Sequence, residues 1–195
     1  MSKSRRAGQD ARPYHHGDLR RALLDAAIEA ITQAGPAAVS LRDLARRAGV
    51  SHAAPAYHFG DKAGLLTAIA ADGFRRLAAT LREAYAPSGS FLEVGVAYVR
   101  FAVTNRAHFE VMFRPELYRQ HDPEVAAARQ ASRALLYGPV AGGTDPGPED
   151  LRVAVAAWSL VHGLATLWLN RNLPHQLGDD PEQITREVAR YLSSR

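Results

Sequence analysis

The sequence predicts an all-α protein, in which an N-terminal three-helix helix-turn-helix domain is followed by a larger helical domain. Apolar residues recur at spacings of three and four in most long segments, which is the period of a helix buried on one side. Gly and Pro interrupt these segments, as at Gly35-Pro36 and at Pro87 to Gly89. Ser40 and Ser51 stand where helix N-caps are expected.

Length and composition limit the class of protein. The chain has 195 residues, enough to bury a core, and no cysteine, which excludes disulfides and thiolate metal sites and fits an intracellular protein. The longest apolar stretch, Val153 to Leu169, contains polar residues and is interpreted as a buried helix, so no membrane span is expected. The N-terminus lacks the apolar segment of a signal peptide. We therefore expect a cytoplasmic location.

The net positive charge belongs to the N-terminal third. Residues 1–62 hold ten Lys and Arg against six Asp and Glu, whereas residues 63–195 hold fourteen of each kind. An excess of this kind is expected where a protein meets phosphate groups. A solvated basic surface is the alternative.

Residues 1–16 form a basic flexible arm in this interpretation, because they carry Lys3, Arg5, Arg6 and Arg12 among few apolar residues. The arm either reaches DNA or serves as a solubilising tail. His15-His16 has no partner ligands at a useful spacing, so no metal site is predicted.

The first helix is expected from Asp18 to Gly35-Pro36, packed across the helix-turn-helix pair. Its apolar face comprises Leu23, Leu24, Ala27, Ile28 and Ile31.

The helix-turn-helix is predicted between Ser40 and Lys62. Ser40 and Asp43 have the spacing of a capping box, so one helix should begin at Leu41. Gly49 suits the positive φ that ends a helix, and Ser51 suits the cap of a second helix from His52. Two short helices joined by a three-residue turn place the second helix in the major groove of DNA.

This stretch resembles the tetracycline-repressor (TetR) family of bacterial one-component regulators. The resemblance rests on an ordered run of residues, which comprises Gly49 to Ser51, Tyr57 to Phe59, Asp61, Lys62, Leu65 and Leu66. The segment Tyr14 to Arg20 also resembles the start of one branch of the family. Two departures stand out: Ala56 holds the place of the first aromatic residue in most relatives, and Pro55 falls at about the fourth position of the predicted helix.

The resemblance implies contacts to double-stranded operator DNA. Small residues allow close approach to base edges, Tyr57 and His58 can donate hydrogen bonds, and cations near helix starts can bind phosphate. Phe59 is assigned to the core. The predicted DNA-binding residues are Arg42, Ser51, His52, Ala53, Ala54, Tyr57, His58 and Lys62; for each, a surface side chain without a contact is the alternative.

A long helix is expected over 61–84. We assign residues 17–62 to the DNA-binding domain and residues 63–195 to the dimerisation and effector-binding domain. The boundary between the two domains falls inside the helix over 61–84, so this helix belongs to both. Ser90 should cap the next helix, a further helix should begin at Pro123 and end before Gly138-Pro139, and residues 138–148 should form a loop.

The helix over 150–170 is apolar nearly all round and needs a partner on its second side. Trp158, His162 and Gly163 resemble the Trp-His-Gly (WHG) signature of one TetR branch. The resemblance implies a homodimer through the helices at 150–170 and 181–193. In the last helix Ile184, Val188, Tyr191 and Leu192 share one face.

No catalytic or cofactor motif stands out. His162 is either a ligand contact or a hydrogen-bonded structural histidine, and Gly163 indicates close helix approach or space for a ligand. The aromatic residues either fill the core or line a cavity. The predicted ligand site consists of Tyr98, Phe101, Met112, Phe113, Tyr137, Trp158 and His162.

The predicted function is therefore DNA-binding transcription regulation, by a repressor that a small, largely apolar ligand releases from its operator. The main alternative is an effector-independent or architectural DNA-binding protein. An α-helical enzyme using His162 would need a carboxylate or second base beside it, which the helix does not supply at i±3 or i±4.

Overall fold

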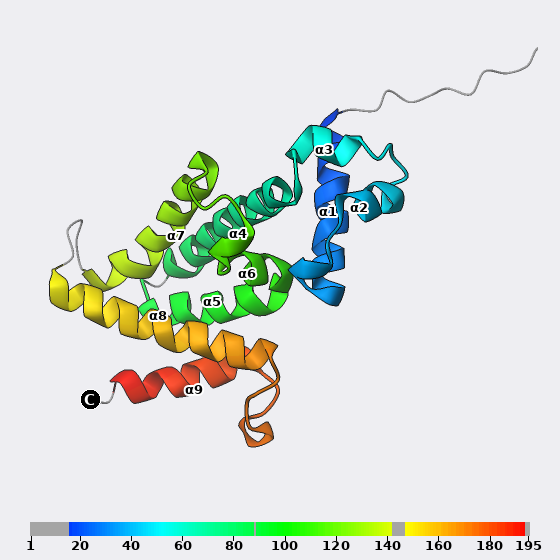
Figure 1. The fold of residues 1–195 in the computed structure, drawn as a ribbon. Coiled ribbons are helices and arrows are strands. Elements are labelled where there is room, and N and C mark those ends of the chain that lie inside the picture. The colour runs from blue at the N-terminus through cyan, green and yellow to red at the C-terminus, as the bar shows by residue number, and fades with distance from the viewer. Residues whose placement is uncertain (1–15, 88, 142–146, 194–195) are drawn as a thin grey trace, which may run out of the picture.

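The computed structural model describes residues 16–87, 89–141 and 147–193, and every regular element in these ranges is helical (Figure 1). The predicted arm lies outside the described residues except for His16. The elements are α1 (His16–Ala34), η1 (Pro36–Ala38), α2 (Leu41–Arg47), α3 (Ala54–Phe59), α4 (Lys62–Tyr85), α5 (Phe91–Thr104), α6 (Arg106–Met112), η2 (Pro115–Leu117), α7 (Pro123–Ala141), α8 (Pro148–Leu169), η3 (His175–Leu177) and α9 (Pro181–Ser193). The predicted fold class is confirmed.

Helices α1, α2 and α3 form a group at one end of the molecule, and α4 leads from this group into the remaining helices (Figure 1). The predicted apolar face of α1 is confirmed, because Leu23, Ala27 and Ile31 are buried against the same core as Leu44 of α2. Burial of these aliphatic side chains is the main favourable term that holds the three short helices together.

Helix α4 begins where the sequence predicts. Asp61 is its N-cap, and its Oδ1 accepts a hydrogen bond of 2.7 Å from the backbone N–H of Gly64. The helix then packs on α5, α6 and α7 through Leu66, Ile69 and Leu77, which are almost fully buried. A Cβ at Gly73 would lie 2.5 Å from the Sδ of Met112 on α6, so any larger residue here would force the Met112 side chain to move.

The start of α5 agrees with the prediction from sequence, whereas the end of α7 does not. Ser90 caps α5 as predicted, with its Oγ 3.4 Å from the backbone N of Glu93. The predicted end of α7 is wrong, since the helix continues through Gly138-Pro139 to Ala141. Pro139 removes one backbone hydrogen bond, but it lies only two residues before the end of the helix, so little of the helix follows it. Residues 142–146 of the predicted loop lie outside the described residues.

Helix α8 is long and apolar but only partly covered. Ala154, Val161, Leu164 and Ala165 are buried against α5 and α7. By length and hydropathy it is the one helix in the described ranges that could cross a membrane, although one such helix is weak evidence. The side that stays uncovered, here called the outer face of α8, comprises Leu151, Val153, Val155, Ala156, Ser159, Gly163, Thr166 and Leu167.

Candidate nucleic-acid interface and ligand site

The helix predicted to read DNA begins later than the sequence suggested. Helix α3 starts at Ala54 with Ala53 at its N-cap, so the prediction of a cap at Ser51 and a start at His52 is wrong. Pro55 explains the shift: it occupies the second position of α3, where its missing N–H leaves no helical bond unmade. The connection between α2 and α3 is consequently six residues, 48–53, instead of three.

The first helix of the pair starts at Leu41 as predicted, but without a capping box. The Ser40 side chain makes no cap hydrogen bond. Asp43 instead accepts from Arg46 and Arg47 at 2.6 Å each, and these hydrogen bonds lower the pKa of its carboxyl group. Gly49 has φ +66°, which confirms the predicted role of this glycine.

The predicted DNA-contacting residues differ in exposure. Ser51, His52 and Ala53 are exposed, as is Tyr57, whose exposed fraction of 82% is unusual for a large aromatic side chain. Ala54 and His58 are half-buried. Phe59 is buried, as predicted, and the guanidinium of Arg20 lies 5.4 Å from the centre of its ring. The structure therefore leaves Tyr57 as the most prominent side chain of α3.

The two cations predicted to bind phosphate are in different situations. Lys62 is half-buried, and its Nζ donates to the backbone carbonyl of Ala37 at 2.8 Å, which ties the start of α4 to η1. Arg42, near the start of α2, is exposed and bonds to no residue that the structure describes. Arg46 on the same helix has an exposed fraction of 71% and was missed, although its place in the last turn of α2 was visible in the sequence.

Three of the residues predicted to bind a ligand, Tyr98, Trp158 and His162, are linked by hydrogen bonds. Tyr98 is fully buried and lies at the centre of a hydrogen-bonded chain: Nε1 of Trp158 donates to its Oη at 3.2 Å, and this oxygen lies 2.8 Å from Nδ1 of His162. The indole N–H can only donate, so the Tyr98 hydroxyl oxygen accepts from Trp158, and its own O–H is available to donate to Nδ1 when the imidazole carries its proton on Nε2. Burial raises the pKa of Tyr98 and lowers that of His162. His162 is thus hydrogen-bonded through Tyr98 of α5 to Trp158 of its own helix.

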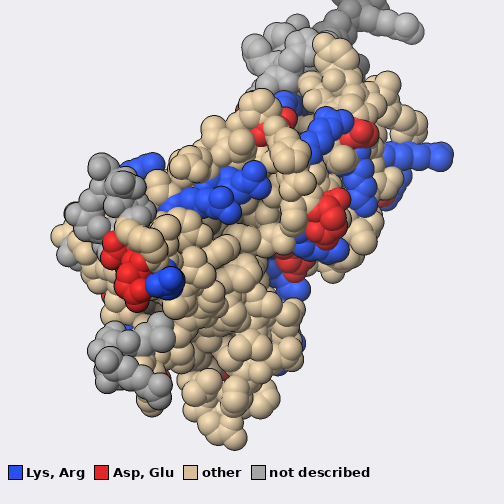
Figure 2. All heavy atoms as spheres, turned by 60° about the vertical axis from the view of Figure 1, so that its left-hand side comes forward, with Lys and Arg blue, Asp and Glu red and all other residues tan. Residues whose placement is uncertain are grey.

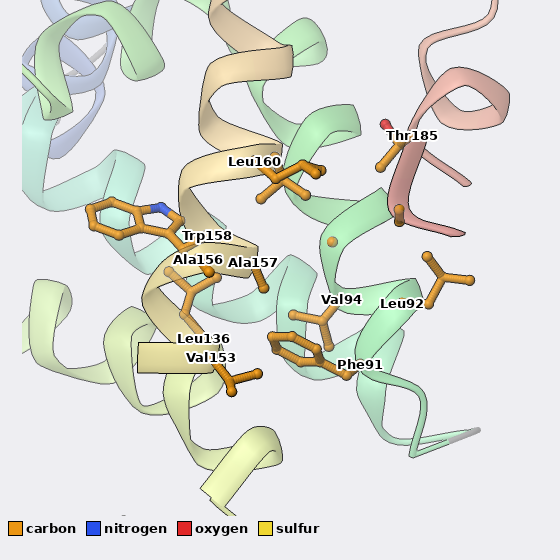
Figure 3. A pocket seen from close by; sticks show the side chains of 13 residues that line it. Phe91, Leu92, Val94, Leu136, Val153, Ala156, Ala157, Trp158, Leu160 and Thr185 are labelled. Carbon is orange, nitrogen blue, oxygen red and sulfur yellow. The ribbon is translucent and has the colours of Figure 1, made fainter. Parts of the chain in front are cut away.

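Two cavities adjoin this cluster. The larger, of about 430 Å³, lies between α5, α8 and α9 and has apolar walls that include Phe91, Val94 and Leu160 (Figure 3). The smaller, of about 180 Å³, lies between α4, the segment after α6, and α7. Met112, Phe113, Tyr137 and Trp158 line the smaller cavity, and Trp158 also lines the larger.

Tyr98, Phe101 and His162 line neither of these cavities. Tyr98 and His162 nevertheless contact the ring of Phe113, which lines the smaller cavity, and the ring of His162 lies 5.8 Å from that of Trp158. Tyr98 and Phe101 are at most 1% exposed and belong to the core. Gly163 has open space around it, with no atom within 4 Å of an added Cβ, so no helix of the described chain approaches it closely.

Sequence reasoning missed two basic residues in the smaller cavity, Arg129 and Arg133 of α7. A signal was present, because Arg129, Arg133 and Tyr137 recur every fourth residue and must share a helix face. Among the described residues, no three His, Asp or Glu side chains are grouped so that they could hold a metal ion.

Comparison with known proteins gives matches over most of the chain. Residues 23–69 match the family model described as "Bacterial regulatory proteins, tetR family", and residues 91–192 match "Tetracyclin repressor-like, C-terminal domain". The HTH-type transcriptional regulator BetI from two Escherichia coli strains is 35% identical over 91 residues, or 47% of this chain and 45% of BetI. The chain thus matches about half the length of these curated relatives.

Solved structures resemble the whole chain. A protein of unknown function from Rhodococcus sp. RHA1 is 36% identical with a TM-score of 0.75, covering 92% of this chain and 96% of its own. The putative regulatory protein SCO4313 is 24% identical with a TM-score of 0.78, covering 94% and 99%, and shows the fold alone. The multidrug binding protein EbrR, solved with imidazole, is 25% identical with a TM-score of 0.57, covering 89% and 93%.

Proposed function

The chain belongs to the TetR family of bacterial transcriptional regulators, and we propose that it is a cytoplasmic repressor released from operator DNA by a small molecule. The observation that carries the DNA-binding part is the exposure of Tyr57 on α3, the second helix of the helix-turn-helix. An exposed aromatic side chain beside exposed small residues at 51–53 suits close approach to a DNA groove. The nearby cation Arg42 supplies charge for the phosphate backbone, whereas Arg46 is also exposed but already pairs with Asp43 at 2.6 Å.

A two-fold homodimer is part of this proposal. Val153, Val155 and Leu167 on the outer face of α8 are 43–50% exposed, and Tyr191 of α9 is 79% exposed. Gly163 lies on the same face with space around it, so a second helix can approach closely there. Figure 2 shows few charged side chains in the lower part of the molecule, towards the end of α8 and the segment that joins it to α9. A second copy that covers this surface would hold two α3 helices about one DNA turn, roughly 34–36 Å, apart.

The effector part of the proposal rests on the two cavities of the larger domain. We assign residues 63–195 to this domain and residues 17–62 to the DNA-binding domain, with α4 shared between them. We also place the chain in the WHG branch of the family, because it contains Trp158, His162 and Gly163. The name of EbrR describes multidrug binding by that protein. For this chain, apolar walls and a volume of about 430 or 180 Å³ suit a small, largely apolar ligand.

Release of DNA would proceed through α4 and α6. Phe74 and Leu77 of α4 line the smaller cavity, and α4 follows directly on α3. Helix α6 packs against α4 as well as against α1 and η1. A ligand that prefers the arrangement in which the α3 helices are wrongly spaced shifts the population away from DNA, whereas equal affinity for both arrangements shifts nothing.

Two measurements on the full chain test the proposal. Mapping its binding sites across a bacterial genome should yield a short palindromic sequence, and an apolar compound library should contain molecules that bind and release this operator. A palindrome without any releasing ligand would favour the effector-independent or architectural alternative. Absence of sequence-selective binding would contradict the repressor function itself.

A further inference from the structure

We propose that the smaller cavity is an effector site for a one-ring aromatic carboxylate, whose charge is held by Arg129 and Arg133 of α7. The inference deepens the proposed release mechanism and rests on it. It also changes the expected ligand class, because a domain with no net charge suggests an uncharged effector, whereas this cavity has a charged rim.

The cavity is apolar inside and basic at its edge. Its inner wall consists of Phe74, Leu77, Met112 and Leu136, each at most 6% exposed. Arg129 is half-buried and Arg133 is exposed, so the two guanidinium groups lie on the solvent side. A ligand that fits this arrangement has an apolar body and a polar end directed outward.

The polar end should be anionic. The lining contains two arginines and no Asp or Glu. Arg129 donates one hydrogen bond, to the backbone carbonyl of Gln120 at 3.1 Å, and Arg133 bonds to no residue in the described part of the chain. The planar guanidinium presents several N–H donors in a geometry that matches a carboxylate.

One acidic residue lies close to this rim. Glu116 and Arg129 both act electrostatically on Tyr118, which lines the cavity. The Glu116 carboxylate, however, pairs with Arg114 at 3.0 Å, so its charge is already matched by another cation. Arg129 and Arg133 are neighbours at i, i+4 and repel each other unless an anion lies between them.

The size of the cavity limits the apolar body to one ring. A cavity of about 150 Å³ is large enough for benzene. At about 180 Å³, this one holds a single ring with a small substituent. Phe113, Tyr137 and Trp158 supply aromatic surfaces for such a ring.

The larger cavity is the weaker site for an effector. No charged side chain lines it, and Val153 and Ala156 of its wall belong to the outer face of α8 that a second copy would cover. The smaller cavity includes none of that face, and it contacts α4 directly through Phe74 and Leu77. Binding there can therefore act on the helix that leads from the DNA-binding domain.

The test compares acids with matching neutral amides on the full chain. Benzoate, phenylacetate and cinnamate are titrated beside benzamide, phenylacetamide and cinnamamide by calorimetry, without DNA. At least one acid should bind about tenfold or more tightly than its amide, since hydrogen bonds to a charged group are the stronger ones. Arg133→Gln should remove this preference and leave amide binding unchanged, and Arg133→Lys should retain most of it.

Arg82→Gln is the matched control, because Arg82 is an exposed arginine of α4 that lines none of the cavities described above. It should leave the preference intact, and circular dichroism should show that all variants are folded. Equal binding of acids and amides, no binding by any acid, or a preference that survives in the Arg129→Gln/Arg133→Gln double variant would overturn the assignment.

The same ligands separate this inference from the proposed function. An acid that binds through Arg133 but leaves the operator complex intact supports the site and contradicts the release mechanism. An acid that releases the operator equally from wild type and Arg133→Gln supports release and overturns the charge-selective site.

Discussion

Arg119 holds both carboxylate oxygens of Asp61, with its Nη2 at 3.1 Å from each, across 58 residues of sequence. Asp61 is the N-cap of α4, and α3 ends two residues earlier at Phe59. The hydrogen bond from the Gly64 N–H is the main cause that lowers the pKa of Asp61, with Arg119 adding to it. The backbone N–H of Arg119 also donates to Oγ1 of Thr67 at 3.0 Å. The segment between α6 and α7 is thereby attached to the first turn of α4.

Replacing Arg119 should weaken the coupling between ligand binding and operator binding more than it lowers the stability of the fold. The ion pair is exposed on both sides, and such pairs contribute little to folding. We expect Arg119→Gln to leave the melting temperature nearly unchanged while it reduces the effect of a releasing ligand on operator affinity. Fluorescence anisotropy with labelled operator measures this effect. Arg82→Gln, which removes an exposed arginine of α4 that lines neither cavity, is the control and should behave like wild type. Equal ligand effects in both variants would show that the Arg119 contact carries no coupling.

Tyr57→Ala should reduce operator affinity by roughly tenfold or more, the size expected when one good base or phosphate contact is lost. Because the side chain is 82% exposed, its removal should change neither the melting temperature nor the dimer. Operator binding and sedimentation are measured on the same preparations. A folded dimeric variant with wild-type affinity would place Tyr57 outside the interface.

Arg42 and Lys62 should differ in their effects. Arg42→Gln should weaken binding about equally for all DNA sequences and lower the slope of log K against log salt by about one, as for one lost phosphate contact. Lys62→Gln should in addition lower the melting temperature, since Lys62 bonds to the Ala37 carbonyl. If Arg42→Gln keeps the full salt slope, Arg42 does not touch phosphate.

Leu167→Glu should dissociate the dimer, because it would bury an unpaired carboxylate against a second copy. Leu167 is 43% exposed in the single chain, so the fold itself should survive. Analytical ultracentrifugation at micromolar concentration should give a monomer, and operator binding should fall with it. A dimer of unchanged stability would mean that the outer face of α8 is not the interface.

Acidification should destabilise the protein through His162. Burial lowers the pKa of this imidazole below its ordinary 6.5, so the unfolded chain binds more protons than the folded chain as pH falls through 6.5. The free energy of unfolding should therefore decrease below about pH 6.5. His162→Gln should show a smaller decrease over the same range in urea titrations. Parallel pH profiles for wild type and variant would show that His162 does not titrate differently on folding.

Local sequence determined much of the fold. Ser90 and Gly49 act on backbone groups within a few positions, and the apolar face of α1 follows from its own periodicity, so these features were predicted correctly. The start of α4 was also predicted correctly, although the capping role of Asp61 was not. Two errors were also local. Pro55 moved the start of α3 to Ala54 because proline prefers the first turn of a helix, and Pro139 lies within α7 because only two residues of the helix follow it.

Tertiary structure alone decided the functional geometry. Lys62 and Ala37 are 25 residues apart, and Tyr98 and His162 are 64 apart, so no short pattern announces either hydrogen bond. Tyr98 was predicted as a ligand contact, and helix packing brings its hydroxyl to Trp158 and His162, a pairing that the sequence did not indicate. The charge of residues 63–195 sums to zero, and the spacing of Arg129 and Arg133 on α7 places them on one helix face, but only packing decides that this face borders a cavity. The composition of a domain gives the number of its charged residues, whereas the packing of its helices decides which charged side chains border a cavity.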